Sequence, residues 1–367
     1  MKALDLTQTA LIQYLEETRK LFEEMLSVNG YGDTVVIIPS SDLGFPHDVI
    51  RIAGGFATGA YVQWISREPV IPIDTCVNDC SVSFFELSED ISELFTEEHF
   101  TNFERRIEDT IFLLNFHRGN HFFSYIQDKD SLKKYLLLHS SANEFKSNYN
   151  GLYPVEGKYF YNHLKKYSNG KRYIRYLHGS DAELFWRISN QLGSFNEARQ
   201  EYLASVFIDG FAKIINSKTY HHYGMPTANS VIMGGHVTAK NDTFPLLTNA
   251  GKNIYLIKYY DVKDDSLIIP NTKGLFITPH GLGKEDITDP VIELNLTKQT
   301  FTLDGYEYNI RFGESLRAHP NLRLRSFNQD KYFSYYHTLY DFSVEKEFVQ
   351  LASWSKNGIK IWLENYL

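Results

Sequence analysis

Short strand-like runs recur along the whole chain, and they constrain the fold more than any other feature. Each run is apolar and partly β-branched, and turn-forming residues bound it. The predicted strands are residues 34–38, 70–73, 81–85, 111–116, 135–138, 254–259 and 275–278. Helical patterns lie between them irregularly rather than in strict alternation. This arrangement predicts an α+β architecture and not a doubly wound one.

Two segments have a helical pattern. The N-terminal segment has apolar residues on one side and ends at Asn29-Gly30, which is a typical helix stop. Residues 181–216 have large apolar side chains near helical spacing, with Gly193 and Gly210 as weak points. No linker, internal repeat or shift in composition divides the chain, so residues 1–367 are predicted to form a single domain.

Composition narrows the class of protein. With 43% hydrophobic and 15% aromatic residues the chain can bury a sizeable core. The N-terminus lacks a signal-peptide pattern, and no run reaches the ~20 apolar residues of a membrane span, so we expect a cytoplasmic protein without a membrane partner. The net charge of -8 excludes a globally basic nucleic-acid-binding surface. Two basic runs, KKYSNGKRYIRY and RAHPNLRLR, are typical of solvated faces more often than of binding sites.

Polar, metal-ligating residues follow several of the predicted strands. Cys76 and Cys80 are the only cysteines, and in a reducing compartment they are better candidates for metal or redox ligands than for a disulfide. Histidines occupy similar places in LLNFHRGNHFF, LLLHSS, TYHHYG and TPHGLGK. Neutral imidazole and thiolate are the ligands that transition metals prefer, so these segments predict a metal site. The alternative is that the histidines bond nearby carbonyl groups in turns.

The order and spelling of these segments resemble the RtcB family of RNA-splicing and RNA-repair ligases, over nearly the whole chain. The family has an Asp-x-x-Cys loop, then Gly-Asn-His-Phe, Leu-His-Ser-Gly-Ser-Arg, a His-His-Asn segment, Ile-Pro-Gly-Ser-Met-Gly and Ser-His-Gly-Ala-Gly-Arg. This chain has DTCVNDCSVS, RGNHFF, LLHSSAN, TYHHYGM, FPLLTNAGK and TPHGLGK. RGNHFF is the most specific of these matches.

The resemblance implies an RtcB-like fold with a two-ion Mn²⁺ centre and a nucleotide site at strand ends. The implied metal ligands are Cys80, His121, His139 and one of His221 or His222. His280 is the implied nucleophile that accepts GMP from GTP. The implied nucleotide-binding residues are Asn120, Lys252, Lys284 and Lys356, with Lys360 as the alternative to Lys356. The implied activity joins an RNA 3'-phosphate or 2',3'-cyclic phosphate, in tRNA or damaged RNA, to a 5'-hydroxyl.

The chain also departs from the family pattern. Val77 stands where the family has a metal-binding aspartate, so Asn78, Asp79 or Asp74 would have to replace that ligand. Residues 246–249 replace a glycine-rich nucleotide segment, and Lys284 replaces an arginine, which removes a bidentate phosphate contact. Use of ATP instead of GTP therefore stays open. So do two other functions: a metal-dependent phosphoesterase, and a catalytically silent metal-binding paralogue that binds RNA ends or a protein partner.

Overall fold

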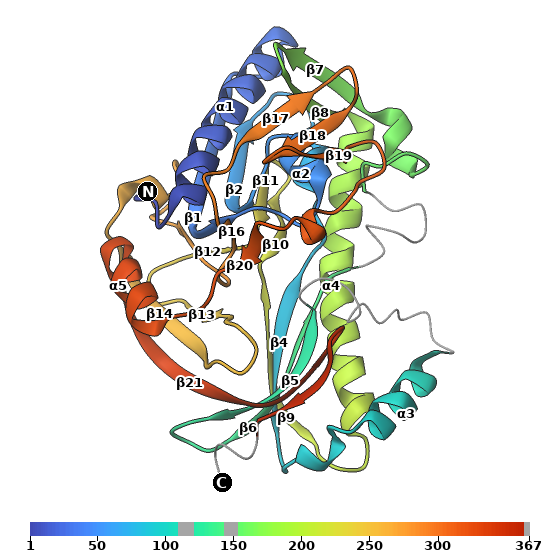
Figure 1. Ribbon diagram of the computed structural model, residues 1–367, viewed down its shortest axis with the longest axis vertical. Coiled ribbons are helices and arrows are strands. Elements are labelled where there is room, and N and C mark those ends of the chain that lie inside the picture. Colours follow the sequence, from blue (N-terminus) through green and yellow to red (C-terminus); the bar gives the residue numbers. More distant parts are fainter. Residues whose placement is uncertain (109–120, 143–152, 363–367) are drawn as a thin grey trace.

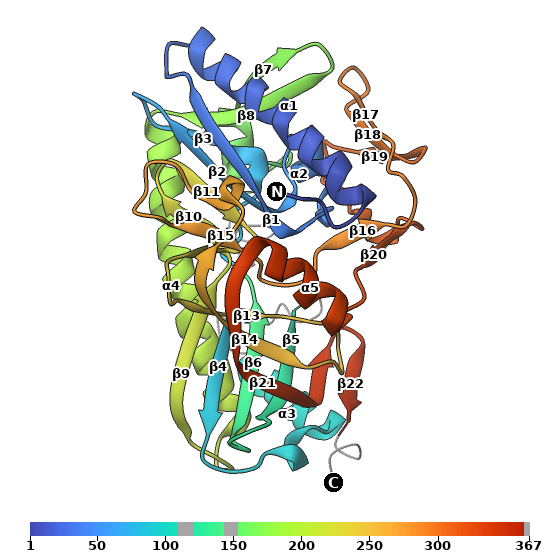
Figure 2. The ribbon, with the colours of Figure 1, turned by 90° about the vertical axis from the view of Figure 1, so that its left-hand side faces the viewer.

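The largest sheet of the molecule carries most of the histidine-bearing segments. The computed structural model describes residues 1–108, 121–142 and 153–362 (Figure 1). Within these ranges the large sheet has eight strands in the order β13-β14-β21-β5-β6-β4-β9, with β22 paired to β21, and all neighbouring strands are antiparallel. The strands are β13 (Thr243–Leu246), β14 (Ile254–Val262), β21 (Tyr340–Ser355), β5 (Phe122–Asp128), β6 (Lys134–Ser140), β4 (Ser81–Leu87), β9 (Ile214–His221) and β22 (Gly358–Ile361). The sheet curls strongly (Figure 2).

A second sheet has the order β1-β2-β11-β10 and lies above the large one in Figure 1. Its strands are β1 (Thr34–Gly44), β2 (Thr58–Ile65), β11 (Ser230–Met233) and β10 (Tyr223–Thr227). The described part of the chain also forms four smaller sheets. Two of them have two strands each: β12 (His236–Thr238) with β15 (Phe276–Thr278), and β16 (Lys284–Asp286) with β20 (Leu322–Leu324). The other two have three strands each: β17 (Ile292–Asn295), β18 (Thr300–Leu303) and β19 (Tyr306–Asn309) in one, and β3 (Val70–Pro72), β8 (Arg172–His178) and β7 (Lys165–Asn169) in the other.

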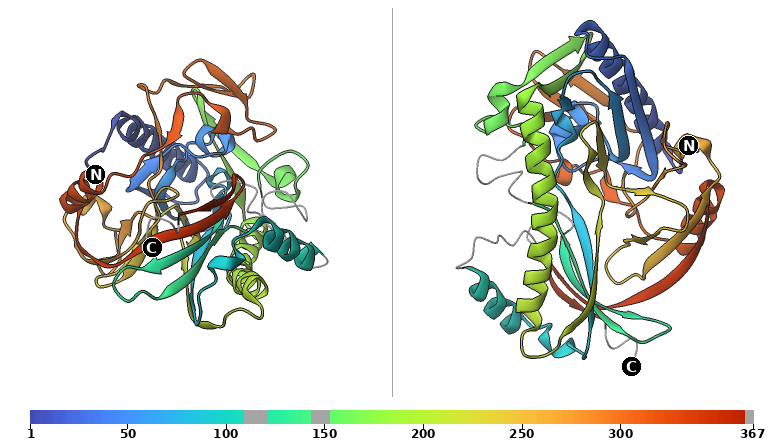
Figure 3. Two further views of the ribbon diagram at one scale, coloured as in Figure 1. Left: turned by 60° about the horizontal axis from the view of Figure 1, so that its bottom comes forward. Right: turned by 180° about the vertical axis from the view of Figure 1, so that it is seen from behind.

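Five α-helices cover these sheets in the described part of the chain: α1 (Leu6–Val28), α2 (Val49–Ala53), α3 (Glu97–Glu108), α4 (Ser180–Ile208) and α5 (Gln329–Leu339). The predicted N-terminal helix is confirmed, with Asp5 accepting a hydrogen bond from the amide of Gln8 and Asn29 at the C-terminal cap. Helix α4 runs along both large sheets (Figure 3). No helix in the described ranges is both long and apolar enough to cross a membrane.

The second predicted helix was too long. Helix α4 ends at Ile208, and the residues from Ile214 onward form strand β9. Gly210 adopts a positive φ of 81° between them, which a helix cannot continue through. The apolar spacing of residues 181–216 therefore combined a helix with the strand that follows it.

The predicted strands agree better with the structure. All six that lie in the described ranges overlap observed strands, and residues 111–116 lie outside these ranges. The mixture of helices with mainly antiparallel sheets fits the predicted α+β class. One core joins α1 to the upper sheet, and another joins α3 and the end of α4 to the large sheet.

Candidate metal and nucleotide site

Four predicted ligand residues lie at the same edge of the large sheet. Cys80 directly precedes β4, His121 directly precedes β5, His139 lies near the end of β6, and His222 directly follows β9. Because β5, β6, β4 and β9 are consecutive and antiparallel, the start of one strand lies beside the end of the next. The register pairs Phe122 with His139 and Ser81 with His221, so the four side chains are brought to one edge.

Three of the four side chains form a buried cluster. The Cys80 sulfur lies 3.2 Å from Nε2 of His139, and that nitrogen lies 3.1 Å from Nε2 of His222. Their ligand atoms all lie within 4.8 Å of one another, and each residue is at most 4% exposed. Nε2 of His121 lies 3.8 Å from the same sulfur but is not part of this group of three. We call Cys80, His139 and His222 the metal cluster.

The chemistry of the metal cluster fits a transition metal. The cysteine sulfur and two imidazole nitrogens lie within 4.8 Å of one another, and a thiolate with two imidazoles is a typical donor set for a divalent ion. Burial, together with the neighbouring His280 and His139, lowers the pKa of His222 well below its usual value and so favours the neutral, ligating form. Nδ1 of His222 has no hydrogen-bond partner among the described residues. Of the two alternatives His221 and His222, the structure brings His222 together with Cys80 and His139.

His221 faces the opposite way. It is exposed, and its Nε2 lies 3.7 Å from the carboxylate of Glu197 on α4. Neighbouring residues on a strand point to opposite faces, so the pair His221-His222 presents only one ring to the cluster. The backbone of His222 is fixed on both sides, because its amide donates to the Cys80 carbonyl and its own carbonyl accepts from the Gly234 and Gly235 amides.

The two acidic candidates have different environments. Asp74 is fully buried and paired with Arg175, whose Nε donates to both carboxylate oxygens at 3.0–3.1 Å. Asp79 has a positive φ of 47° and is 5% exposed, and one of its carboxylate oxygens has no hydrogen-bond partner among the described residues. Burial raises the pKa of Asp79 well above its usual value. Its carboxylate does not belong to the metal cluster as it stands.

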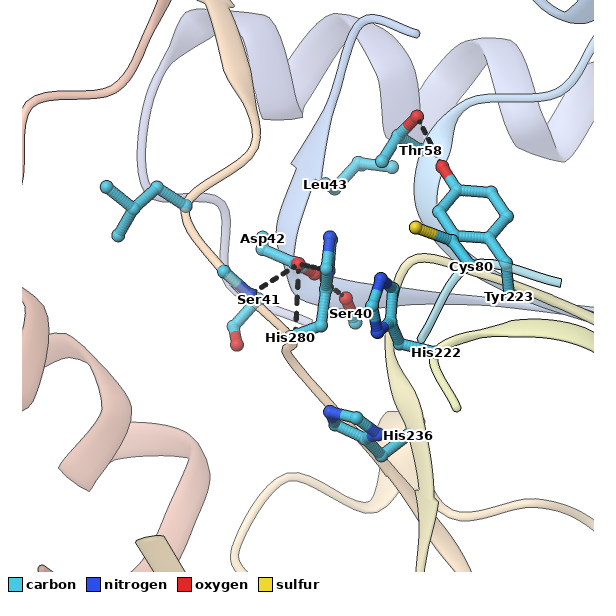
Figure 4. Close-up of polar contacts among 12 residues, drawn as sticks. Ser40, Ser41, Asp42, Leu43, Thr58, Cys80, His222, Tyr223, His236 and His280 are labelled. Carbon is cyan, nitrogen blue, oxygen red and sulfur yellow. Dashed lines mark hydrogen bonds and ion pairs between the residues drawn. The ribbon is translucent and has the colours of Figure 1, made fainter. Parts of the chain in front are cut away.

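His280 lies against the metal cluster and is held by a buried carboxylate. Its ring stacks on that of His222, with centroids 4.7 Å apart and planes inclined by 20°. Its Nδ1 lies 2.6 Å from Oδ2 of Asp42 on β1, and the amides of His280 and Gly281 donate to the same oxygen at 3.3 Å. Figure 4 shows His280 between Asp42 and His222. A neutral His280 therefore donates Nδ1–H to Asp42 and keeps its lone pair on Nε2.

Two glycines allow this close packing. Gly234 has a φ of +82°, and a Cβ there would lie 2.8 Å from Cε1 of His280. Gly283 has a φ of +69°, and a Cβ there would lie 1.9 Å from the Asp42 carbonyl oxygen. A side chain at either position would displace the loop that carries His280 from β1.

The helix α4 supports the metal cluster from behind. Asn196, fully buried, donates through Nδ2 to the Asp79 carbonyl at 3.1 Å, to the Ser81 hydroxyl at 2.9 Å and to the Ser140 carbonyl at 3.2 Å. These bonds join the start of β4 to the end of β6, which are the two strand ends that carry Cys80 and His139. Asn196 thus positions the cluster without belonging to it.

His236 is a further buried histidine, which the sequence analysis did not single out. Its ring stacks on Phe244 at 4.3 Å and lies 6.1 Å from that of His222. Its Nδ1 contacts the His221 carbonyl at 3.1 Å, and burial lowers its pKa to about 3. His236 is therefore neutral and lines the site beside His222 (Figure 4).

The predicted nucleotide-binding residues are dispersed. Lys284 follows His280 by four residues, and its Nζ lies 2.7 Å from Nδ1 of His47, to which Arg317 also donates at 3.3 Å. Burial, followed by the charges of Arg317 and Lys356, lowers the pKa of Lys284 to about 8. Lys252 lines a separate pocket of about 420 Å³ with Tyr255 and Phe327 among others. Asn120 lies outside the described residues.

The basic runs contribute mainly intramolecular contacts. Arg172 donates to Glu17 at 2.7 Å, Arg175 pairs with Asp74, and Arg325 donates to Asp5 at 2.7 Å. The interpretation of the runs as solvated faces was wrong for two of these arginines, because Arg325 is buried and Arg175 pairs with the buried Asp74. Among the three arginines 317, 323 and 325 of the second run, Arg317 is the one beside His47.

A scan against models of known protein families and a search of curated proteins both returned no match. The fold and the site by themselves define a mixed α/β protein with a buried thiolate-imidazole cluster that could hold a metal ion, next to a carboxylate-held histidine.

Proposed function

We propose that the protein is a divergent RtcB-like RNA ligase that joins RNA 3'-phosphate and 5'-hydroxyl ends through a histidine-GMP intermediate on His280. The observation that carries this proposal is the position of His280. It is held by the buried Asp42 on one side and stacked on His222 of the metal cluster on the other. A turn histidine that only bonds a carbonyl needs neither contact, whereas a nucleophilic imidazole needs a fixed tautomer and nearby positive charge.

The residues of the chain can support each step. With Nδ1–H donated to Asp42, the Nε2 lone pair of His280 attacks the α-phosphorus of GTP, and the P–O bond to pyrophosphate breaks. An oxygen of the RNA 3'-phosphate then attacks the same phosphorus, and the N–P bond returns its electron pair to Nε2. Finally the 5'-hydroxyl oxygen attacks the activated RNA phosphate, loses its proton, and GMP leaves.

Positive charge for the phosphates comes from two sources in this proposal. Cys80, His139 and His222 would hold a divalent ion, Mn²⁺ by resemblance, which when bound would offset charge on the phosphate oxygens. Lys284 follows His280 by four residues, and together with the exposed Arg317 it presents cations beside His47. A few local cations of this kind allow an acidic protein to bind RNA ends.

The proposal is tested by covalent labelling. The purified chain is incubated with Mn²⁺ and α-labelled GTP, with α-labelled ATP in parallel, and the protein is separated from nucleotide. We expect an adduct that is labile in acid and stable in base, as a phosphoramidate is, and we expect His280→Ala to abolish it. His337→Ala, which removes an exposed histidine of α5, is the matched control and should label like the wild type.

Metal content and folding are measured on the same samples. Protein that is folded and metal-loaded but forms no adduct with either nucleotide contradicts the ligase proposal. That result would favour the silent metal-binding paralogue, and hydrolysis of a phosphoester without any adduct would favour the phosphoesterase.

A further inference from the structure

A second group of potential metal ligands lies outside the metal cluster. Asp286 ends strand β16, Asp304 lies in the turn between β18 and β19 with a φ of 50°, and His319 follows the short 3-10 helix η6 (Leu316–Ala318). One ligand atom from each residue lies within 4.8 Å of the other two. None of these strands carries a residue of the metal cluster, so the two groups are built by different parts of the fold.

Asp286 has a buried carboxylate oxygen that accepts no hydrogen bond from a donor in the described part of the chain. The residue is 5% exposed, and its Oδ1 accepts from the amide and the hydroxyl of Thr288 at 2.9 and 2.7 Å. Its Oδ2 is buried and has no hydrogen-bond partner among the described residues. A buried carboxylate oxygen without a donor is costly, so this atom needs either a bound cation or a proton shared with the adjacent Asp304.

The second carboxylate lies next to the first. Asp304 is half-buried, and it accepts from the Val291 amide at 2.9 Å and from Nδ2 of Asn321 at 2.8 Å. Burial and the adjacent Asp304 carboxylate raise the pKa of Asp286. No lysine or arginine in the described ranges lies within 4.0 Å of either carboxylate. The pair therefore needs either a shared proton or a cation.

His319 has the environment of a metal ligand. It is 3% exposed, and its Nε2 lies 3.1 Å from the Leu303 carbonyl oxygen. A carbonyl accepts but cannot donate, so Nε2 carries the proton and the lone pair is on Nδ1. That nitrogen accepts a bond from the Asn321 amide at 3.2 Å, and a metal ion bound to Nδ1 would have to replace this bond. Donation of the other ring N–H to a backbone carbonyl is the usual arrangement around a histidine that binds a metal.

We propose that Asp286, Asp304 and His319 form a second, structural site for a divalent cation. Two carboxylates and an imidazole suit Zn²⁺ or Mn²⁺ better than Ca²⁺, which takes six to eight oxygen ligands. Zn²⁺ is the natural probe, because three protein ligands are common in its sites.

The site would connect separate segments of the chain. Asp286 belongs to the strand pair β16–β20, and Asp304 belongs to the three-stranded sheet β17-β18-β19. The backbone of Asp286 also exchanges hydrogen bonds with the Thr7 hydroxyl on α1, at 2.9 and 3.3 Å. A bound cation would therefore hold the three-stranded sheet against β16 and, through it, against α1.

The experiment measures Zn²⁺ binding to the full chain after treatment with a chelator. His139→Ala removes a ligand of the metal cluster, and Cys80→Ser serves as an alternative background. Asp79→Asn is combined with each of them, so that an ion at Asp79 is not counted and the remaining Zn²⁺ reports the second site. We expect one equivalent of Zn²⁺ in either background. Adding Asp304→Asn or Asp286→Asn should weaken its binding at least tenfold. Asp289→Asn, an exposed residue of the same loop, is the matched control and should leave binding unchanged.

Thermal unfolding gives the second measurement. Zn²⁺ should raise the Tm of His139→Ala and should no longer do so once Asp286→Asn is added. The proposal is overturned if His139→Ala and Cys80→Ser bind no Zn²⁺, or if the Asp286 and Asp304 substitutions leave its affinity unchanged. A rise in the Tm of metal-free protein on Asp286→Asn, without Zn²⁺ binding by the parent, would show that the pair shares a proton instead. None of these measurements depends on ligase activity.

Discussion

The ring of His280 lies parallel to that of His222 at a centroid distance of 4.7 Å, so the proposed nucleophile and a proposed metal ligand are in direct contact. Residues 222 and 280 come from separate parts of the chain, after β9 and after β15. The contact places any phosphate bound to His280 close to the metal cluster. This relationship makes the effects of individual substitutions specific enough to test.

The first prediction compares the proposed metal ligands His139 and His222 with His221, the exposed residue next to His222 in the chain. His139→Ala and His222→Ala should weaken binding of Mn²⁺ or Zn²⁺ by about ten- to a hundredfold or more, because loss of a direct ligand matters at least as much as loss of a residue that orients one. His221→Ala is the matched control, since this exposed ring faces Glu197. Equilibrium dialysis with metal analysis measures the affinities. Equal affinities for all three variants and the wild type would contradict the metal cluster.

The second prediction concerns Asp42. Asp42→Asn should slow formation of the His280 adduct by about a hundredfold or more, because an amide can donate to Nδ1 and so stabilise the wrong imidazole tautomer. Metal content should stay the same, since Asp42 does not belong to the metal cluster. The rate is followed with α-labelled GTP. A variant that labels at the wild-type rate would show that Asp42 does not orient His280.

The third prediction separates the two acidic residues of the cysteine loop. Asp74→Asn should lower the free energy of unfolding by about 3–5 kcal/mol, because it leaves the buried Arg175 without its partner. The number of bound ions should not change. Asp79→Asn should instead remove a second equivalent of metal, because Asp79 alone of the two keeps a carboxylate oxygen without a hydrogen-bond partner.

Denaturant titration and metal analysis of both variants check this separation. If Asp79→Asn retains every equivalent of metal, the second ion of the family is absent here or is bound by other residues. Loss of metal in Asp74→Asn at unchanged stability would contradict the role of the Arg175 pair.

The sequence predicted the ligand residues of the site better than their surroundings. The strand-like runs indicated segments with metal-ligating residues, whereas the family resemblance implied Cys80, His121, His139 and one of His221 or His222. Antiparallel pairing brings these strand ends together. Asp42 was missed, since strand β1 was predicted to end at residue 38 and Asp42 lies 238 residues from its partner His280. The contact of Asp42 with His280 depends on how two sheets pack together, and a local sequence pattern does not show this.

Contacts between residues far apart in the chain also explain other differences between the predictions and the structure. Asp74 was considered as a replacement for the family's metal-binding aspartate. Its partner Arg175 lies 101 residues away, in a run that had been interpreted as a solvated face. Strand β21 was not predicted, because its first half alternates buried and charged residues irregularly around a register shift with β14. Long-range pairing decided these elements, whereas α1, with its cap and apolar face, could be predicted locally.

The last prediction concerns acid stability and His236. Burial lowers the pKa of His236 to about 3 in the folded chain, whereas an unfolded histidine has a pKa of about 6.5. Between these two values the unfolded state binds one more proton than the folded state. The contribution of His236 to stability is therefore fully present above pH 6.5 and is lost as the pH falls, by about 1.4 kcal/mol for each pH unit.

His236→Asn should remove this dependence, because an amide does not titrate and its Nδ2 can still donate to the His221 carbonyl that Nδ1 of His236 contacts. Urea unfolding of chelator-treated protein at several values between pH 4 and pH 7 gives the slope for each protein. His222, whose pKa is also lowered, contributes equally to both slopes, so their difference isolates His236. We expect the variant to lose less stability on acidification, by up to about 1.4 kcal/mol per pH unit. Identical slopes would mean that His236 becomes protonated in the folded chain as readily as in the unfolded one, which its burial against Phe244 argues against.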